Sequence, residues 1–139
     1  MIKRKPVSAI MTKDVITLSK SDSLELAEHL FKSHHIRHIP VVNGEKIIGM
    51  LSYTDLLRIS FADAVDEEEE TVDAVVYNMF TIGQVMAKNL ISVSSSASIK
   101  EVAEILSKKE FHAIPVAEKG NLVGIVTTTD LINYLLEQF

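Results

Sequence analysis

Residues 111–116 read FHAIPV and residues 124–130 read GIVTTTD, and the same pattern appears earlier as IRHIPV at residues 36–41 and GMLSYTD at residues 49–55. Each matched position lies 75 residues from its partner, and the alignment runs without a gap over residues 11–56. A spacing that is kept through apolar runs, turns and polar positions indicates one supersecondary unit used twice. The chain is therefore predicted to be a tandem repeat.

The length of the chain limits how the two copies can be stable. A chain of 139 residues is one ordinary domain or two very small ones. Each copy spans about half of it and would bury too little surface to be stable alone, so we expect the copies to pack face to face.

Composition favours a soluble protein of the cytoplasm. The absence of cysteine excludes a disulfide framework and a thiolate metal site, and fits a reducing compartment. No apolar run approaches the ~20 residues that a membrane span needs, and the basic start MIKRKP lacks the apolar core of a signal peptide. We expect no membrane association.

The net charge of −5 is concentrated in one segment. Residues 62–77 hold seven of the 19 acidic residues and no basic one, which leaves 12 acidic against 14 basic side chains elsewhere. This nearly neutral body would not repel a small anion. It is too weakly basic to predict nucleic-acid binding, which needs a dense stripe of Lys and Arg.

The first copy reads as β-α-β-β-α. Strands are predicted at residues 15–18, 39–42 and 47–51, with Asn43-Gly44 as the hairpin turn between the last two. A helix is expected to reach about His34, and a second helix to open at Ser52. The first helix has residues from the Ser19–Ser23 turn as its N-cap, and its apolar face consists of Leu24, Ala27, Leu30 and Phe31.

The second copy repeats this order. Strands are predicted at residues 91–93, 114–116 and 122–126, and a closing helix at residues 131–139. The two helices of this copy are expected to pack inward through Ile99, Val102, Ala103 and Leu106, and through Ile132, Leu135, Leu136 and Phe139.

The acidic segment separates the copies, which gives a first repeat at residues 1–61, a linker at residues 62–80 and a second repeat at residues 81–139. A charge run is usually a solvated stretch. Alternatively, Glu67 to Glu70 precede apolar residues and would favour the N-terminus of a short helix that contacts a partner chain.

Ser52-x-x-Asp55 and Thr127-x-x-Asp130 are the most informative polar pairs. One interpretation is a helix cap, in which the hydroxyl and the acid bond to the first turn. Because each pair follows a strand and opens a helix, a second interpretation is ligand binding, since a carboxylate there can accept hydrogen bonds from the vicinal hydroxyls of a ribose. The two interpretations are compatible.

Basic residues precede both prolines. Arg37 and His38 could together bind a phosphate, whereas the second copy offers only His112, followed by Ala113. His34, His35 and His38 do not predict a metal site, because no acid or cysteine completes a ligand set.

No catalytic pattern is present. The sequence contains no phosphate-binding glycine loop and no nucleophile elbow. Gly49 and Gly124 are single glycines within strand patterns, which indicates close approach of another segment.

Taken together, Met11 with residues 15–17, the IRHIPV run and Gly49-x-x-Ser52-x-x-Asp55, repeated 75 residues on, resemble the cystathionine-β-synthase-type (CBS) domain. A tandem pair resembles a Bateman module. The resemblance implies an α/β (α+β) fold in which two β-α-β-β-α repeats pack sheet to sheet with pseudo-twofold symmetry. It also implies two clefts between the repeats that bind adenosine ligands.

The resemblance assigns roles residue by residue. It implies that Ser52 with Asp55, and Thr127 with Asp130, bind ribose hydroxyls, and that Arg37, His38 and His112 meet phosphates, with one site dominant because Ala113 stands where the first copy has His38. The implied adenine pockets combine Met86 and Phe111 with Asp55, and Met11 and Ile36 with Asp130.

The resemblance implies regulation rather than turnover, so we expect a module that is not an enzyme. It would bind AMP, ADP or ATP, or else S-adenosylmethionine, and signal to an unknown protein partner, as a homodimer. The alternative is a structural or dimerisation module without a ligand. An enzyme is the third hypothesis, but no nucleophile or metal constellation supports it.

Overall fold

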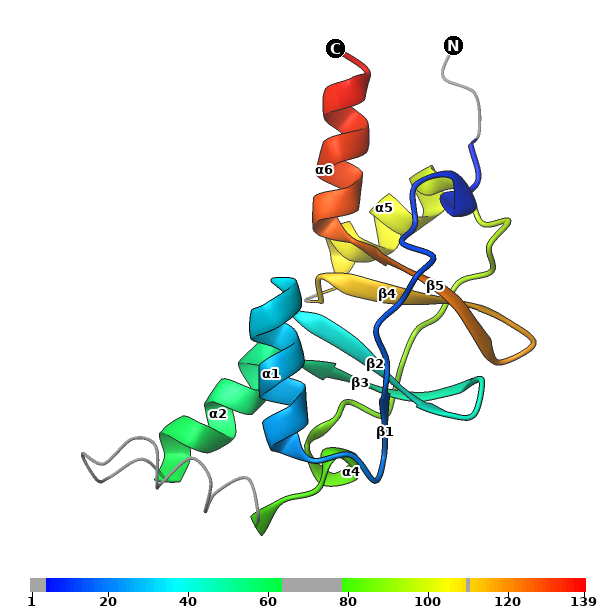
Figure 1. Cartoon of the computed structure of the whole chain (residues 1–139). Coiled ribbons are helices and arrows are strands. Elements are labelled where there is room, and N and C mark those ends of the chain that lie inside the picture. The colour runs from blue at the N-terminus through cyan, green and yellow to red at the C-terminus, as the bar shows by residue number, and fades with distance from the viewer. Residues whose placement is uncertain (1–4, 64–78, 110) are drawn as a thin grey trace. The chain divides into compact units, whose positions relative to one another are not determined.

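The computed structural model describes residues 5–63, 79–109 and 111–139. Figure 1 shows the elements coloured in chain order. They are η1 (Val7–Ala9, a 3-10 helix), β1 (Leu18–Ser19), α1 (Leu24–His34), β2 (His38–Asn43), β3 (Lys46–Ser52), α2 (Tyr53–Asp63), α4 (Ile82–Val85), α5 (Ile99–Lys108), β4 (Ala113–Glu118), β5 (Asn121–Thr127) and α6 (Thr128–Glu137).

The described residues form two compact units, which we name after the acidic residue each contains. The Asp55 unit comprises the described parts of residues 16–44 and 48–89. The Asp130 unit comprises those of residues 1–15, 45–47 and 90–139. The predicted linker helix falls largely on residues 64–78, outside the described residues, and the predicted boundaries at residues 61 and 80 stay a prediction.

In the Asp55 unit, β1 pairs in parallel with β2, with Leu18 opposite Val41. The crossover between them is α1, as predicted, because parallel neighbours cannot be joined by a tight turn. The N-cap of α1 is Ser23, whose hydroxyl accepts a hydrogen bond of 3.1 Å from Leu26 N. The two-residue connection from β2 to β3 contains Gly44 at a φ of 64°, which confirms the predicted turn.

The core of the Asp55 unit confirms the predicted face of α1. Leu24, Ala27 and Phe31 are buried, and Leu30 packs against them as a partly buried residue. The buried residues of this core cluster are Leu18, Leu24, Ala27, Phe31, Ile39, Val41, Leu51, Leu56, Ile82 and Met86.

In the Asp130 unit, β4 and β5 form an antiparallel pair in which Pro115 lies opposite Ile125. Helix α5 begins after Ser98, whose hydroxyl accepts a hydrogen bond of 3.1 Å from Glu101 N. The core formed under these elements consists of Val7, Val102, Leu106, Ile114, Val116 and Val126. Both repeats therefore have the predicted mixed α/β order.

The first strand of each repeat is shorter than predicted. Residues 15–17 are outside β1, and of residues 91–93 only Val93 forms an isolated parallel bridge, with Val116. If this register continued back by one residue, Thr17 would lie opposite Pro40, and proline has no N–H to donate to a ladder. The predicted strands at 15–18 and 91–93 were wrong in extent because their partner strands each contain such a proline.

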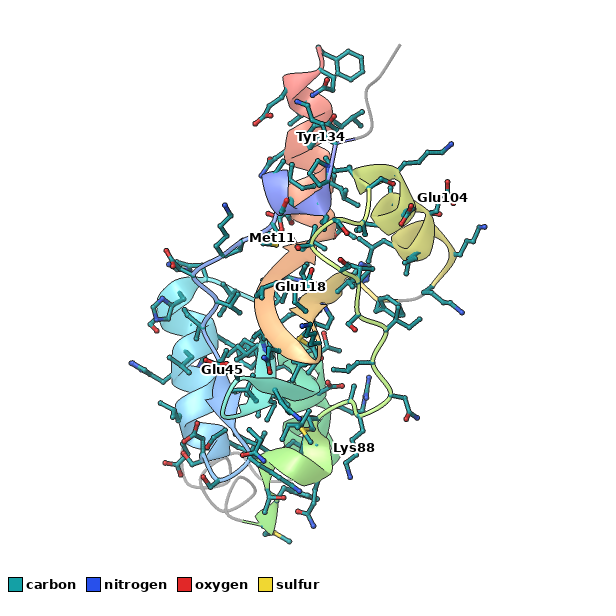
Figure 2. The ribbon with its side chains drawn as sticks, turned by 90° about the vertical axis from the view of Figure 1, so that its right-hand side faces the viewer. Met11, Glu45, Lys88, Glu104, Glu118 and Tyr134 are labelled. Atoms are coloured by element: carbon teal, nitrogen blue, oxygen red, sulfur yellow. The ribbon has the colours of Figure 1, made fainter. Side chains whose placement is uncertain are left out.

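The segment after Val93 is fixed by side chains instead. The Glu118 carboxylate oxygen Oε1 accepts hydrogen bonds from Ser95 N at 2.7 Å, Ser95 Oγ and Ser94 Oγ, at 2.6 and 3.0 Å respectively. Figure 2 labels Glu118. Because these bonds favour the charged form, they lower the pKa of Glu118, the Ser95 hydroxyl contributing most.

The inward packing predicted for the closing helix was wrong. In α6, Ile132 and Leu135 are each 56% exposed, Leu136 is 65% exposed, and Phe139 beyond the helix is 96% exposed. Among the residues of α6, only Leu131 packs against the core of its unit as a partly buried residue. Helix α6 extends beyond the end of β5, so the later turns of the helix do not pack on the core of the unit (Figure 1).

The N-terminal segment belongs to the Asp130 unit. Val7 is fully buried there, and Val7 N donates a hydrogen bond of 2.7 Å to Ala97 O. Further along, Thr12 and Ile125 exchange two backbone hydrogen bonds of 2.8 and 3.0 Å. The residues before the first strand of one repeat thus complete the unit that contains the body of the other repeat.

Candidate functional site

The Ser52-Asp55 pair joins the end of β3 to the start of α2. Asp55 N donates to Ser52 Oγ at 3.0 Å, and Ser52 N donates to Asp55 Oδ2 at 3.2 Å. This is a reciprocal cap, so the capping interpretation is confirmed here. The side chain of Asp55 remains 22% exposed, with Oδ1 directed away from the cap toward Arg58 Nη1 at 3.4 Å.

The Thr127-Asp130 pair forms the same cap between β5 and α6. Asp130 N donates to Thr127 Oγ1 at 3.2 Å, and Asp130 Oδ2 accepts from Thr127 N at 2.9 Å and from Thr127 Oγ1 at 3.2 Å. Within the described residues, Oδ1 of Asp130 accepts no hydrogen bond. Each cap therefore orients one carboxylate and leaves one of its oxygens outside the cap.

The predicted phosphate-binding residues are attached to the same helix starts. Tyr53, the first residue of α2, donates its N–H to Arg37 O at 2.8 Å. At the matched position of the second repeat, Thr128 N donates to His112 O at 3.0 Å. The side chains of Arg37 and His112 are exposed. The fold thus brings a basic residue and a hydroxyl-x-x-Asp pair together twice, although they are 15 residues apart in sequence.

His38 opens β2 and is partly buried, and Ala113, its counterpart, opens β4 and is buried. The first copy therefore presents two basic residues at this place and the second copy one.

The two methionines of the predicted adenine pockets lie against glycines. A methyl group added at Gly49 would overlap Sδ of Met86, and one added at Gly124 would overlap Sδ of Met11. This confirms that both glycines permit close approach of another segment. Met86 shares the Asp55 unit with Asp55, and Met11 shares the Asp130 unit with Asp130.

The remaining pocket residues are Ile36 and Phe111. Ile36 is partly buried against the core of the Asp55 unit, and Phe111 against that of the Asp130 unit. The predicted combinations of Phe111 with Asp55 and of Ile36 with Asp130 join residues of different units, and they stay predictions.

Two contacts beside Asp55 were missed by the sequence reasoning. The rings of Phe31 and Tyr53 meet with centroids 5.4 Å apart, which packs α1 against the start of α2. The ion pair of Arg58 with Asp55 has a recognisable signal, because residues three apart on a helix are neighbours on its surface.

Over residues 5–63, 79–109 and 111–139, no group of three or more His, Asp or Glu side chains could hold a metal ion. Among the helices of the same residues, none combines the length and apolar character that crossing a bilayer requires.

Comparison with known proteins gives two matches to one family. Residues 7–62 and residues 82–137 each match the family described as CBS domain. The chain is 30% identical over 131 residues to the uncharacterized protein MJ1225 of Methanocaldococcus jannaschii, covering 94% of this chain and 42% of that protein. It is 28% identical over 134 residues to an inosine-5′-monophosphate dehydrogenase of Thermoplasma acidophilum, covering 95% and 24% respectively. The chain thus spans less than half of either relative.

Two solved structures with bound ligands share the fold. One is the CBS domain pair of protein MJ0100 in complex with 5′-methylthioadenosine and S-adenosyl-L-methionine, with a TM-score of 0.80 at 24% identity, covering 99% of this chain and 100% of that chain. The other is CBSX2 in complex with AMP, with a TM-score of 0.78 at 21% identity, covering 96% and 97%.

Proposed function

Because the chain belongs to the CBS domain family and carries two such domains in tandem, we propose that it is a regulatory module that binds an adenine nucleotide (AMP, ADP or ATP) and signals to a protein partner. In the proposal Asp55 with Ser52, and Asp130 with Thr127, bind the ribose hydroxyls. Arg37, His38 and His112 bind phosphate, and Met86 and Met11 contact the base.

One observation carries this proposal. In both repeats a backbone hydrogen bond, Tyr53 N to Arg37 O or Thr128 N to His112 O, fixes a basic residue beside the helix start that holds the exposed carboxylate oxygen. A carboxylate accepts hydrogen bonds from a diol, and a cationic side chain beside a helix N-terminus favours an anion. A phosphorylated ribose offers both groups in one ligand.

The ligand class draws support from relatives. A CBS pair of this fold binds AMP in CBSX2, and another binds 5′-methylthioadenosine and S-adenosyl-L-methionine in MJ0100. S-adenosylmethionine is therefore the second ligand of the proposal. It lacks phosphate, so Arg37 and His112 would contribute little to its binding.

Calorimetry with AMP, ADP, ATP and S-adenosylmethionine tests the proposal on wild type, Asp55→Asn, Asp130→Asn and the double variant. Asparagine keeps an acceptor for the cap but loses the charge, so folding is preserved while the diol loses a charged partner. Hydrogen bonds to charged groups are worth ~1.5–3 kcal/mol, so we expect affinity to fall by about tenfold to a hundredfold per site. Absence of binding heat with all four ligands in wild type would refute it.

A dimerisation module without a ligand is the second candidate. It is favoured by the apolar side chains of α6, which are more than half exposed at Ile132, Leu135 and Leu136. Large exposed apolar patches mark interaction sites. Native mass spectrometry of the purified chain would report the subunit number and any retained small molecule together, so a homodimer without nucleotide, and without nucleotide-dependent melting, would favour this candidate.

The proposal assigns no catalysis to this chain, and no nucleic acid as a partner. One of its relatives is an enzyme that contains a similar region. In the proposal such a region regulates a catalytic domain and does not itself catalyse a reaction. The partner of this module stays unidentified. A cytoplasmic location is part of the proposal and rests on the absence of cysteine.

A further inference from the structure

The ion pair at the start of α2 distinguishes the two candidate sites. Arg58 Nη1 lies 3.4 Å from Oδ1 of Asp55, whereas the cap uses Oδ2 of the same carboxylate. Oδ1 is therefore the oxygen that the proposed function leaves for a ribose hydroxyl. Arg58 contacts the atom that a ligand would need.

The second repeat has no counterpart to this cation. The 75-residue offset places Asn133 at the position of Arg58, one turn after Asp130 on α6. Asn133 is exposed and uncharged, and both cap bonds to the Asp130 carboxylate end on Oδ2. Among the residues that the structure describes, no cation pairs with Asp130, so a ligand hydroxyl can reach Oδ1 without displacing one of them.

The difference adds to the asymmetry already described. Arg37, His38 and Arg58 of the first repeat are matched in the second by His112, Ala113 and Asn133. The matched positions thus hold two arginines in the first repeat and none in the second.

The Arg58 side chain can change partners at little cost. It is 73% exposed, and exposed ion pairs contribute little to stability. Its planar fork matches a phosphate bidentately, which a single contact to Oδ1 does not use. A ligand with a phosphate can therefore draw Arg58 away from Asp55 and replace the contact that it loses.

We infer that Arg58 makes the Asp55 site selective for adenosine ligands that carry a 5′-phosphate, whereas the Asp130 site discriminates less. This inference rests on the proposed function. An uncharged nucleoside competes with Arg58 for Oδ1 of Asp55 and offers Arg58 nothing in return. A nucleoside monophosphate competes for the same oxygen and gives Arg58 a stronger acceptor.

The test exchanges the two side chains. Titration calorimetry measures the Kd of AMP and of adenosine for Arg58→Asn in an Asp130→Asn background, which isolates the Asp55 site. The reciprocal Asn133→Arg is measured in an Asp55→Asn background. We expect the preference for AMP over adenosine to fall about tenfold, equivalent to ~1.4 kcal/mol, in the first and to rise by a similar factor in the second.

The outcome separates this inference from the proposed function. If wild type binds AMP but Arg58→Asn keeps the same ratio of the two Kd values, the inference is refuted and the proposed function stands. An equal weakening of AMP and adenosine also refutes it, because that pattern reports a structural role. If wild type binds neither ligand, both fail together. Arg58→Lys is the matched control and should give an intermediate ratio, because it keeps the charge without the fork.

Discussion

Gly124→Ala is the substitution for which the structure predicts the sharpest effect on stability. A Cβ at this position would overlap Sδ of Met11 and would lie 3.0 Å from Thr12 O. The methionine side chain is flexible and can turn away. The carbonyl cannot, because Thr12 and Ile125 exchange hydrogen bonds of 2.8 and 3.0 Å.

The size of the effect follows from these two contacts. Adding a methyl group to a packed site typically costs ~1–3 kcal/mol, and more when backbone must move. For a chain of this length such a loss lowers Tm by roughly 3–10 °C. Thermal unfolding followed by circular dichroism, with urea titrations for the free energy of unfolding, would measure both quantities.

A double-mutant cycle tests the stated cause. Met11→Ala removes the sulfur that the new methyl group would meet, so Gly124→Ala/Met11→Ala should be less destabilised than the sum of the single variants by about 1 kcal/mol or more. Gly120→Ala is the matched control, since its φ is 83° and a Cβ there meets nothing within 4 Å. Its cost should come from the backbone alone and should add to that of Met11→Ala.

Two results would refute the reasoning. Gly124→Ala could melt within about 1 °C of wild type, far below the shift expected for an added methyl group. Alternatively, its cost could add fully to that of Met11→Ala, which would mean that Met11 does not lie over Gly124. Gly49→Ala with Met86→Ala repeats the experiment in the Asp55 unit, where the same contact is described.

Three further predictions concern caps, pH and an exposed face. Ser52→Ala and Thr127→Ala should each lower the free energy of unfolding by ~1 kcal/mol through loss of the N-cap, whereas Thr127→Ser should keep the cap. Urea titrations would measure these free energies, and equal values for all three variants would contradict the prediction. The pKa of Glu118 is lowered in the folded protein, so its contribution to stability is present above its ordinary value of 4.5 and is lost as pH falls through the folded value. Glu118→Gln should therefore be less stable than wild type at pH 6, and this difference in stability should shrink as the pH falls below 4.5. A difference that stays constant with pH would count against the role of the serine bonds. Leu135→Ser with Leu136→Ser, at side chains 56% and 65% exposed, should change monomer stability by less than ~0.5 kcal/mol but should abolish any homodimer seen by size-exclusion chromatography, and an unchanged dimer would exclude this face.

Local patterns in the sequence predicted most of the secondary structure. The cap at Ser23, the turn at Gly44 and the face of α1 depend on neighbours within a few residues, so they could be read directly. The attachment of Arg37 to the start of α2 was not predicted from the sequence. It rests on a backbone bond to Tyr53 that no side-chain pattern records.

The errors arose where burial depends on distant parts of the chain. The spacing of Ile132, Leu135 and Leu136 is the same whether α6 packs on its own core or on another surface. Periodicity therefore could not predict which surface the apolar face of the helix contacts. Residues 91–93 are apolar enough to predict a strand. The strand does not form over this length because Pro115 on the neighbouring strand has no N–H to donate.

The backbone exchange described for the N-terminal segment has a consequence for dissecting the molecule. Val7 and Thr12 form backbone hydrogen bonds with Ala97 and Ile125, and Val7 is part of the core, so a fragment that begins after the acidic stretch would lose these bonds and a buried side chain. Conversely, an isolated fragment that ends before the acidic stretch would contain Val7 and Thr12 without the residues to which they bond. If the chain is divided at the acidic stretch, we expect that the two fragments must be mixed before either one recovers its native structure.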